Sequence, residues 1–158
     1  MTAERFTALR TTRSARATLA LGKRLGALLQ PGDVVALVGE LGAGKTAFVR
    51  GLGEGLGLAE GARVASPSYT IVNAYELARP VRGALALMHL DLYRFEPEGS
   101  DEALEAVGFA ELNEGAIVVV EWPEHAPAAL AAATVKVVIE DRGGDERTLV
   151  ISRVAPAP

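Results

Sequence analysis

The sequence predicts an α/β domain of three layers, in which helices cover both faces of a mixed, mainly parallel sheet. Two short apolar runs, at 33–38 and 116–120, have the β-branched composition of strands that are buried on both faces. Segments with helical spacing alternate with such runs, and this alternation favours parallel strands. Near the C-terminus, 134–140 and 147–152 flank a turn with two glycines and predict an antiparallel hairpin.

The first predicted element is a helix from Ser14 to Leu29. Its leucines recur near helical spacing, Ser14 is a suitable N-cap, and Pro31 with Gly32 forms a stop signal. The buried strand at 33–38 follows and ends in glycine. A second helix is expected from 46 to about 56, although glycine at every second position should weaken its C-terminal part.

The middle of the chain predicts two more strands and a short helix. Segments 68–77 and 84–90 have strand character, and the turn between them contains Pro80 and Gly83. At 100–105 an acidic first turn follows Ser100, which is the expected N-cap. The apolar strand at 116–120 and the terminal hairpin complete the order of elements.

Length and composition predict one domain over 1–154 and a flexible tail at 155–158. The 158 residues include no cysteine, which excludes disulfides and thiolate chemistry. No window is long and apolar enough for a membrane span, and no secretory signal precedes the domain, so we expect a cytoplasmic protein. A net charge of −4 gives no general attraction to nucleic acid, and we expect no binding to DNA.

The pattern GxxxxGK[ST] is fully matched by GELGAGKT at 39–46, directly after a buried strand and before a helix. In this context glycines let backbone N–H groups turn toward phosphates, and the helix N-terminus adds its dipole. Lys45 is expected to reach the β- and γ-phosphates of ATP, and the Thr46 hydroxyl is expected to bind Mg²⁺. The expected nucleotide-binding residues are Glu40, Leu41, Gly42, Ala43, Gly44, Lys45 and Thr46.

Two carboxylates, Asp91 and Glu121, follow predicted buried strands and could help to hold magnesium. Their position in the sequence does not rank one above the other, and each could also be an ordinary acidic residue at a strand end. His89 is expected to be structural, because we expect it on the opposite face of its strand from Asp91. Trp122 could pack beside the site or simply cover the core, and Arg94 is close enough to Asp91 to be considered.

A hydroxyl-rich segment follows the second predicted helix and could sense the γ-phosphate as a switch. The alternative is a turn that begins at proline and leads into a strand. The residues of this candidate switch are Ser66, Pro67, Ser68, Tyr69 and Thr70.

The chain resembles the TsaE family of ATPases in bacterial tRNA threonylcarbamoyladenosine biosynthesis. Four motifs carry the resemblance, in the family's order and spacing: GELGAGKT at 39–46, SPSYT at 66–70, HLDLYR at 89–94 and VEWPE at 120–124. The departures are Glu40, where the family usually has Asp, Ser68, where it usually has Thr, and Leu90, where Phe is common. Ser68 keeps its hydroxyl, so only the fine tuning of the switch is affected.

This resemblance implies that Thr46 and Glu121 bind magnesium, that Lys45 clamps the phosphates, and that Asp91 belongs to the hydrolytic site. It also implies two protein partners, TsaB and TsaD, whose complex modifies adenosine 37 of tRNA, so that tRNA is met indirectly. ATP hydrolysis would then drive or reset that complex. Two alternatives are a small-metabolite kinase and a nucleotide-dependent binding module with negligible turnover.

Overall fold

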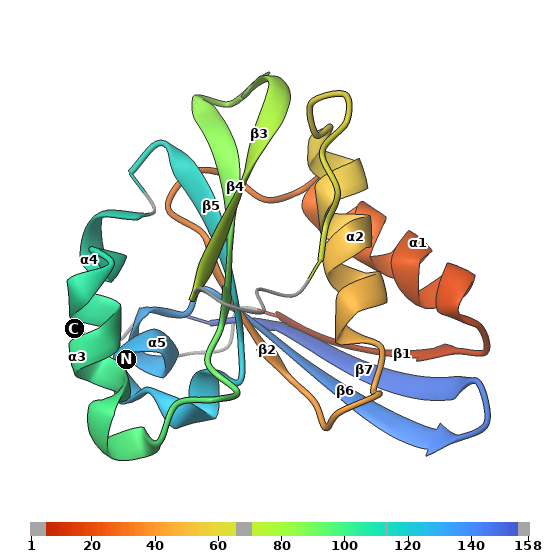
Figure 1. Ribbon diagram of the computed structural model, residues 1–158. Coiled ribbons are helices and arrows are strands. Elements are labelled where there is room, and N and C mark those ends of the chain that lie inside the picture. Colours follow the sequence, from red (N-terminus) through yellow and green to blue (C-terminus); the bar gives the residue numbers. More distant parts are fainter. Residues whose placement is uncertain (1–5, 66–70, 113, 155–158) are drawn as a thin grey trace.

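The computed structural model describes residues 6–65, 71–112 and 114–154 (Figure 1). The candidate switch at 66–70 and the predicted tail at 155–158 lie outside these ranges. Within the described residues, the strands form a single seven-stranded sheet in the order β1-β7-β6-β2-β5-β4-β3. The strands are β1 (Phe6–Thr12), β2 (Val34–Val38), β3 (Val72–Val81), β4 (Ala84–Asp91), β5 (Ala116–Glu121), β6 (Val135–Gly143) and β7 (Glu146–Arg153).

The sheet is mixed, with a parallel centre as predicted. Strands β6, β2, β5 and β4 pair in parallel, while β7 and β3 pair antiparallel to their neighbours. Strand β1 pairs antiparallel with β7 and therefore runs in the direction of the central strands. The predicted C-terminal hairpin is confirmed as β6 and β7, which extend the sheet on one side.

Helices cover both faces of this sheet, which confirms the three layers (Figure 1). Helices α1 (Ala15–Gly26) and α2 (Lys45–Leu56) lie on one face. The other face carries α3 (Pro97–Ala106), α4 (Phe109–Leu112), the 3-10 turn η1 (Pro123–His125) and α5 (Pro127–Ala132).

The central strands supply both halves of the core, because successive side chains of a strand point to opposite faces. Val35 and Ile117 belong to the cluster under α1 and α2. Val34 and Val118 belong to the cluster under α3 and α5. Strand β5 is buried along its whole length, so its apolar run reflects burial on two faces.

Glycines of α2 allow it to pack very closely against α1. A Cβ atom on Gly51 would lie 2.1 Å from the Leu19 carbonyl oxygen, and one on Gly55 would lie 2.2 Å from the Lys23 carbonyl oxygen. The helix continues to Leu56 despite these residues. Their low helix propensity is offset by the contact that only glycine permits.

Two local predictions have different outcomes. Ser14 is the N-cap of α1, and its hydroxyl accepts from the Ala17 N–H at 3.0 Å. The N-cap assigned to Ser100 is wrong, because α3 begins earlier, at a proline after Glu96. Proline is favoured in the first helical turn, and Ser100 instead donates its hydroxyl to the Glu96 carbonyl at 2.8 Å.

Two features at the edges of the sheet, strand β1 and the position of Pro80 within β3, were not predicted from the sequence. Strand β1 has no continuous apolar run and pairs only with β7, so its hydrophobic signal is weak. Pro80, expected in a turn, lies within β3, at the other edge of the sheet, where proline is tolerated.

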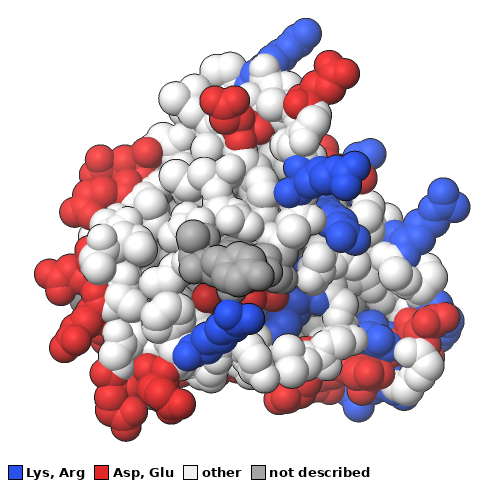
Figure 2. All heavy atoms as spheres, viewed as in Figure 1, with Lys and Arg blue, Asp and Glu red and all other residues white. Residues whose placement is uncertain are grey.

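The surface over α3 is acidic. Figure 2 shows red side chains along the margin where α3 and α4 lie in Figure 1. The exposed acidic residues of α3 are Glu98, Asp101, Glu102 and Glu105. Among the described helices, none combines the length and apolar character needed to cross a membrane.

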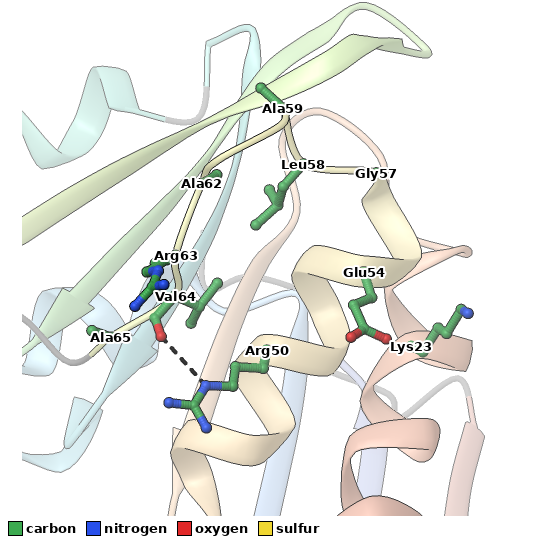
Figure 3. Close-up of a pocket in the computed structure, with 10 residues that line it drawn as sticks. All are labelled: Lys23, Arg50, Glu54, Gly57, Leu58, Ala59, Ala62, Arg63, Val64 and Ala65. Carbon is green, nitrogen blue, oxygen red and sulfur yellow. Dashed lines mark hydrogen bonds between the residues drawn. The ribbon is translucent and has the colours of Figure 1, made fainter.

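The loop from α2 toward β3 runs back along α2 and borders an open groove of about 720 Å³ (Figure 3). Leu58, Val64 and Ala65 line it from the loop, and Arg50 lines it from α2. Arg50 Nε donates to the Val64 carbonyl at 3.4 Å, which ties the end of this loop to α2. The groove contains no candidate site residue, but it fixes the course of the chain up to Ala65.

Candidate functional site

The GELGAGKT motif forms the connection between β2 and α2. Gly42 and Gly44 have φ angles of 79° and 104°, in the left-handed region that glycine adopts without steric cost. The Ala43 N–H donates to the Glu40 carbonyl at 3.1 Å and closes a tight turn. Helix α2 starts at Lys45, directly after Gly44, so the helix N-terminus with the positive end of its dipole lies at the loop.

The C-terminal ends of the central strands meet at this loop. Asp91 of β4 lies opposite Glu121 of β5, and Leu37 of β2 lies opposite Glu121 on its other side. A hollow of about 410 Å³ opens here, lined by Lys45, Thr46 and both carboxylate residues. The structure therefore brings together the phosphate loop and the two carboxylates that the sequence selected.

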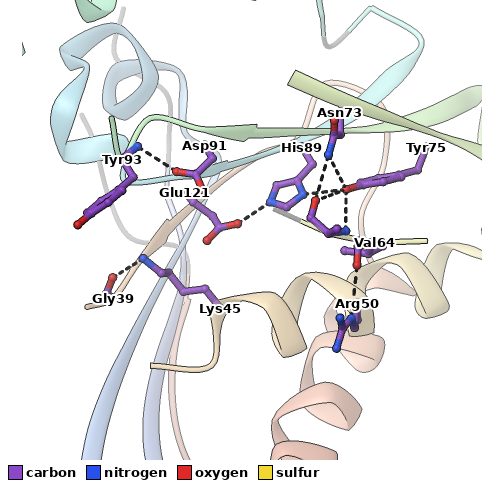
Figure 4. Close-up of polar contacts among 11 residues, drawn as sticks. Gly39, Lys45, Arg50, Val64, Asn73, Tyr75, His89, Asp91, Tyr93 and Glu121 are labelled. Carbon is purple, nitrogen blue, oxygen red and sulfur yellow. Dashed lines mark hydrogen bonds and ion pairs between the residues drawn. The ribbon is translucent and has the colours of Figure 1, made fainter. Parts of the chain in front are cut away.

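Lys45 is 6% exposed and lies at the centre of the site (Figure 4). Its ammonium group donates to the Gly39 carbonyl at 2.5 Å and lies 4.0 Å from the centre of the Trp122 ring, a cation–π contact. Burial lowers the pKa of Lys45, and the negative charges of Glu121 and Asp91 oppose that shift. The site thus holds a partly desolvated cation among carboxylates.

Asp91 and Glu121 are close enough to repel each other. Burial is the main cause that raises the pKa of Asp91, and the Glu121 charge adds to it. The Tyr93 N–H, which donates to Asp91 Oδ1 at 2.9 Å, acts in the opposite direction. A divalent cation between these groups would relieve the repulsion.

The donor set fits magnesium. The Thr46 hydroxyl and the two carboxylates are hard oxygen ligands of the kind that Mg²⁺ prefers beside substrate phosphates. In the part of the chain that the structure describes, no group of three or more His, Asp and Glu side chains is arranged to hold a metal alone. Mg²⁺ at sites of this kind usually takes one or two carboxylates and completes its coordination with water and substrate phosphate oxygens.

Trp122 lies beside the site, so of its two interpretations the structure favours the first. Its φ angle is 56°, a left-handed conformation that is strained for a bulky residue and that often occurs at functional sites. The ring packs against Tyr93 and His125, with centroids 5.1 Å and 5.4 Å away. This arrangement holds the indole over Lys45.

The expected orientation of His89, on the opposite face of its strand from Asp91, is wrong. It lies two residues before Asp91, so the pleat places both side chains on the same face of β4. The His89 ring is fully buried, with Nε2 2.5 Å from Glu121 Oε2 and Nδ1 3.1 Å from the Tyr75 hydroxyl oxygen. The two-residue period of a strand was sufficient to predict from the sequence that His89 shares a face with Asp91. The contact of His89 with Tyr75 could not be predicted in this way, because it depends on the register between β3 and β4.

Arg147 of β7 braces the phosphate loop from outside, and no sequence pattern indicated this role. Its guanidinium donates to the carbonyls of Ala43 at 3.0 Å and Gly42 at 3.3 Å, and it pairs with Asp141 at 3.1 Å. The Ala43 carbonyl and the Gly44 N–H belong to the same peptide group, and the described peptide bonds are trans. The Gly44 N–H therefore points in the opposite direction to the carbonyl that accepts from Arg147. Arg147 thereby restrains the peptide groups that follow Gly42 and Ala43 in the phosphate loop.

The remaining candidates lie further out. Glu40 and Leu41 are exposed, and Leu41 lines the rim of the hollow. Arg94 is exposed and does not line the hollow. The candidate switch at 66–70 lies outside the described residues.

A glycine-rich loop between a parallel strand and a helix, with strand-end carboxylates beside its lysine, defines a protein with the P-loop NTPase-like fold. The family model described as threonylcarbamoyl adenosine biosynthesis protein TsaE matches residues 12–149. The chain therefore belongs to the TsaE family.

Individual relatives agree with this assignment. The chain is 36% identical over 137 residues to the tRNA threonylcarbamoyladenosine biosynthesis protein TsaE of Bacillus subtilis, covering 87% of this chain and 80% of that protein. It is 35% identical over 142 residues to the protein of the same name from Treponema pallidum, covering 89% and 97%. The crystal structure of Bacillus subtilis YdiB superimposes with a TM-score of 0.67 at 31% identity, covering 98% of this chain and 88% of that one.

Proposed function

We propose that this protein is a P-loop ATPase that binds and hydrolyses Mg-ATP in the biosynthesis of threonylcarbamoyladenosine at position 37 of tRNA. The observation that carries the proposal is the single hollow that joins the phosphate loop, Lys45, Asp91 and Glu121. Membership of the TsaE family supports the biosynthetic context. In this proposal hydrolysis drives or resets a TsaB–TsaD complex, and this chain does not transfer the threonylcarbamoyl group itself.

The proposed roles of the site residues are those that the resemblance to the TsaE family implies, and the chemistry of each side chain suits its role. The loop amides and Lys45 bind the β- and γ-phosphates, and Thr46 and Glu121 hold magnesium. When bound, Mg²⁺ neutralises charge on the phosphate oxygens. Asp91 is proposed to act beside the metal, at the edge where β4 and β5 end. Trp122 keeps the lysine in place and shields it from water.

The charge balance of the site supports metal dependence. The negative charges of Glu121, Asp91, Glu124 and Glu40 all act on Lys45. Free ATP would bring further negative charge to a site that is already rich in carboxylates, and one lysine cannot offset it. We therefore expect nucleotide binding to depend strongly on magnesium.

The position of Arg94 bears on the rate of the isolated protein. This arginine is exposed and does not line the hollow, and Lys45 is the only cation among the described residues that do. We therefore propose slow hydrolysis by the protein alone and faster hydrolysis in the complex with its partners. A binding module with negligible turnover would show no such acceleration.

Contact with tRNA is proposed to occur through the partners. The protein has a net charge of −4, and α3 presents a row of exposed carboxylates to solvent (Figure 2). Both features disfavour association with a polyanion. Work on tRNA in a bacterial cell would place the protein in the cytoplasm.

The proposal is tested by calorimetry of the pure protein with ATP, with and without magnesium, and by phosphate release with and without TsaB and TsaD. We expect magnesium-dependent binding and a rate that rises with the partners. Transfer of phosphate to a metabolite instead of release would indicate a kinase. Absence of nucleotide binding under every condition would defeat the proposal.

Replacing Arg147 with alanine is expected to weaken Mg-ADP binding roughly 10- to 100-fold, because charge-assisted bonds to two loop carbonyls are lost. The control is Arg142→Ala on the same hairpin, since Arg142 is half exposed and pairs with Glu140 away from the loop. Calorimetry on both variants makes the comparison. Equal affinity in the two variants would show that Arg147 does not shape the loop.

A further inference from the structure

A chain of buried polar contacts leads from Glu121 away from the phosphate loop and ends at the backbone of Ala65 (Figure 4). Glu121 Oε2 lies 2.5 Å from His89 Nε2, and His89 Nδ1 lies 3.1 Å from the Tyr75 hydroxyl oxygen. The Tyr75 hydroxyl oxygen also lies 2.8 Å from the Ala65 carbonyl oxygen and accepts from the Ala65 N–H at 3.2 Å. His89 is fully buried, and Glu121 and Tyr75 are 3% and 7% exposed, so water competes little for these bonds.

The direction of the bond between His89 and Glu121 follows from the protons available. An ionised carboxylate carries no proton, so His89 Nε2 donates to Glu121. The single Tyr75 hydroxyl proton has two acceptors within reach, His89 Nδ1 and the Ala65 carbonyl. Asn73 also donates to that carbonyl at 3.0 Å, so the carbonyl oxygen is satisfied in both arrangements. In both of them His89 presents its Nε2–H to Glu121.

This bond fixes the Glu121 side chain before any ligand arrives. The imidazole engages Oε2, and Oε1 is then the Glu121 oxygen that would bind a metal ion in the hollow lined by Glu121 and Thr46. A glutamate without such a partner would lose rotamer freedom at the moment of metal binding. Groups that orient a metal ligand in this way commonly change metal affinity roughly 10- to 100-fold.

The far end of the chain of contacts is also anchored. Ala65 and Val64 belong to the loop that runs from α2 toward β3 (Figure 3). Tyr75 holds Ala65, and Arg50 of α2 holds the Val64 carbonyl. Because Lys45 begins α2, the helix of the phosphate loop and the Glu121 carboxylate are both tied to this one loop.

We propose that His89 and Tyr75 are positioning residues of the nucleotide site: His89 orients Glu121 for magnesium, and Tyr75 links that orientation to the loop at Ala65. This inference rests on the proposed Mg-ATP function. A role in packing alone predicts a loss of stability with an unchanged magnesium dependence. Positioning predicts a changed magnesium dependence even in variants of equal stability.

The experiment measures Mg-ADP affinity by calorimetry over a series of magnesium concentrations, and phosphate release by the complex with TsaB and TsaD. His89→Leu removes the donor to Glu121 and is expected to raise the half-saturating magnesium concentration roughly 10- to 100-fold. His89→Gln keeps an N–H at the Nε2 end and is expected to recover most of that loss. Tyr75→Phe removes one hydroxyl, and we expect a shift of roughly twofold to tenfold.

Ser100→Ala is the matched control for Tyr75→Phe. It also removes the hydrogen bond of a buried hydroxyl, but that hydroxyl lies on α3, on the other face of the sheet. Thermal melts of all variants give their stabilities. If His89→Leu does not fold, Tyr75→Phe decides the question by its difference from Ser100→Ala.

The two proposals fail in different ways. A wild-type protein without magnesium-dependent nucleotide binding would remove the proposed function. A wild type that binds Mg-ADP, together with folded His89→Leu and Tyr75→Phe variants of unchanged magnesium dependence, would overturn the positioning role alone.

Discussion

Alanine at position 45 is expected to reduce phosphate release by the complex with TsaB and TsaD at least about 100-fold. Lys45 is the cation that the phosphate loop presents inside the hollow, where burial strengthens its interaction with charge. Its removal leaves Asp91 and Glu121 without that compensating charge. The measurement is the rate of phosphate release at saturating Mg-ATP, with Mg-ADP affinity from calorimetry beside it.

The fold of the Lys45→Ala variant is expected to persist. Lys45 belongs to neither apolar core cluster, so its truncation leaves both clusters intact. Loss of the ammonium group removes its desolvation cost, which opposes the loss of its attraction to Glu121 and Asp91. The matched control is Lys136→Ala, which removes an exposed lysine from β6. Melting curves and circular dichroism establish folding in both variants. A folded Lys45→Ala protein with more than half of the wild-type rate would contradict the role of Lys45.

The parts of the site that the sequence predicted are those that local pattern and strand direction determine. The phosphate loop is contiguous in sequence, and its geometry needs only the strand before it and the helix after it. Asp91 and Glu121 are 30 residues apart, but each follows a buried strand, and the carboxyl ends of parallel strands meet at one edge. Their meeting beside Lys45 therefore follows from the fold class.

The contacts that the sequence did not predict depend on register and on distant pairing. Arg147 is 104 residues from Ala43, and only the pairing of the C-terminal hairpin brings it to the loop. Tyr75 meets His89 because of the register of β3 and β4 and their side-chain conformations. A single sequence carries no periodic signal for either contact.

Edge strands are also harder to predict from the sequence than central strands. β2 and β5 were found because burial on two faces produces continuous apolar runs. In β1, arginine and threonine interrupt the apolar residues, and the strand is held in the sheet by its backbone pairing with β7. Local propensity does not distinguish such a segment from a loop.

Replacing Glu121 with glutamine is expected to raise the half-saturating magnesium concentration and to lower phosphate release at least about 100-fold. Glutamine has nearly the same shape, and its carbonyl oxygen can still accept from His89 Nε2. The substitution therefore removes the negative charge while keeping the packing of β5. Loss of the buried Glu121 charge removes its attraction to Lys45 but also relieves its repulsion with Asp91, and we expect no large drop in the melting temperature.

Glu124→Gln is the control that separates metal binding from general electrostatics. Glu124 is exposed, and its charge also acts on Lys45, so this variant removes a negative charge near the lysine without removing a proposed ligand. If charge near Lys45 were the whole effect, the two variants would raise the half-saturating magnesium concentration alike. We expect only Glu121→Gln to do so, because an exposed carboxylate is screened by solvent and one that binds the metal directly is not. A magnesium titration of phosphate release that is the same for Glu121→Gln and wild type would exclude Glu121 as a metal ligand and leave Asp91 as the remaining strand-end candidate.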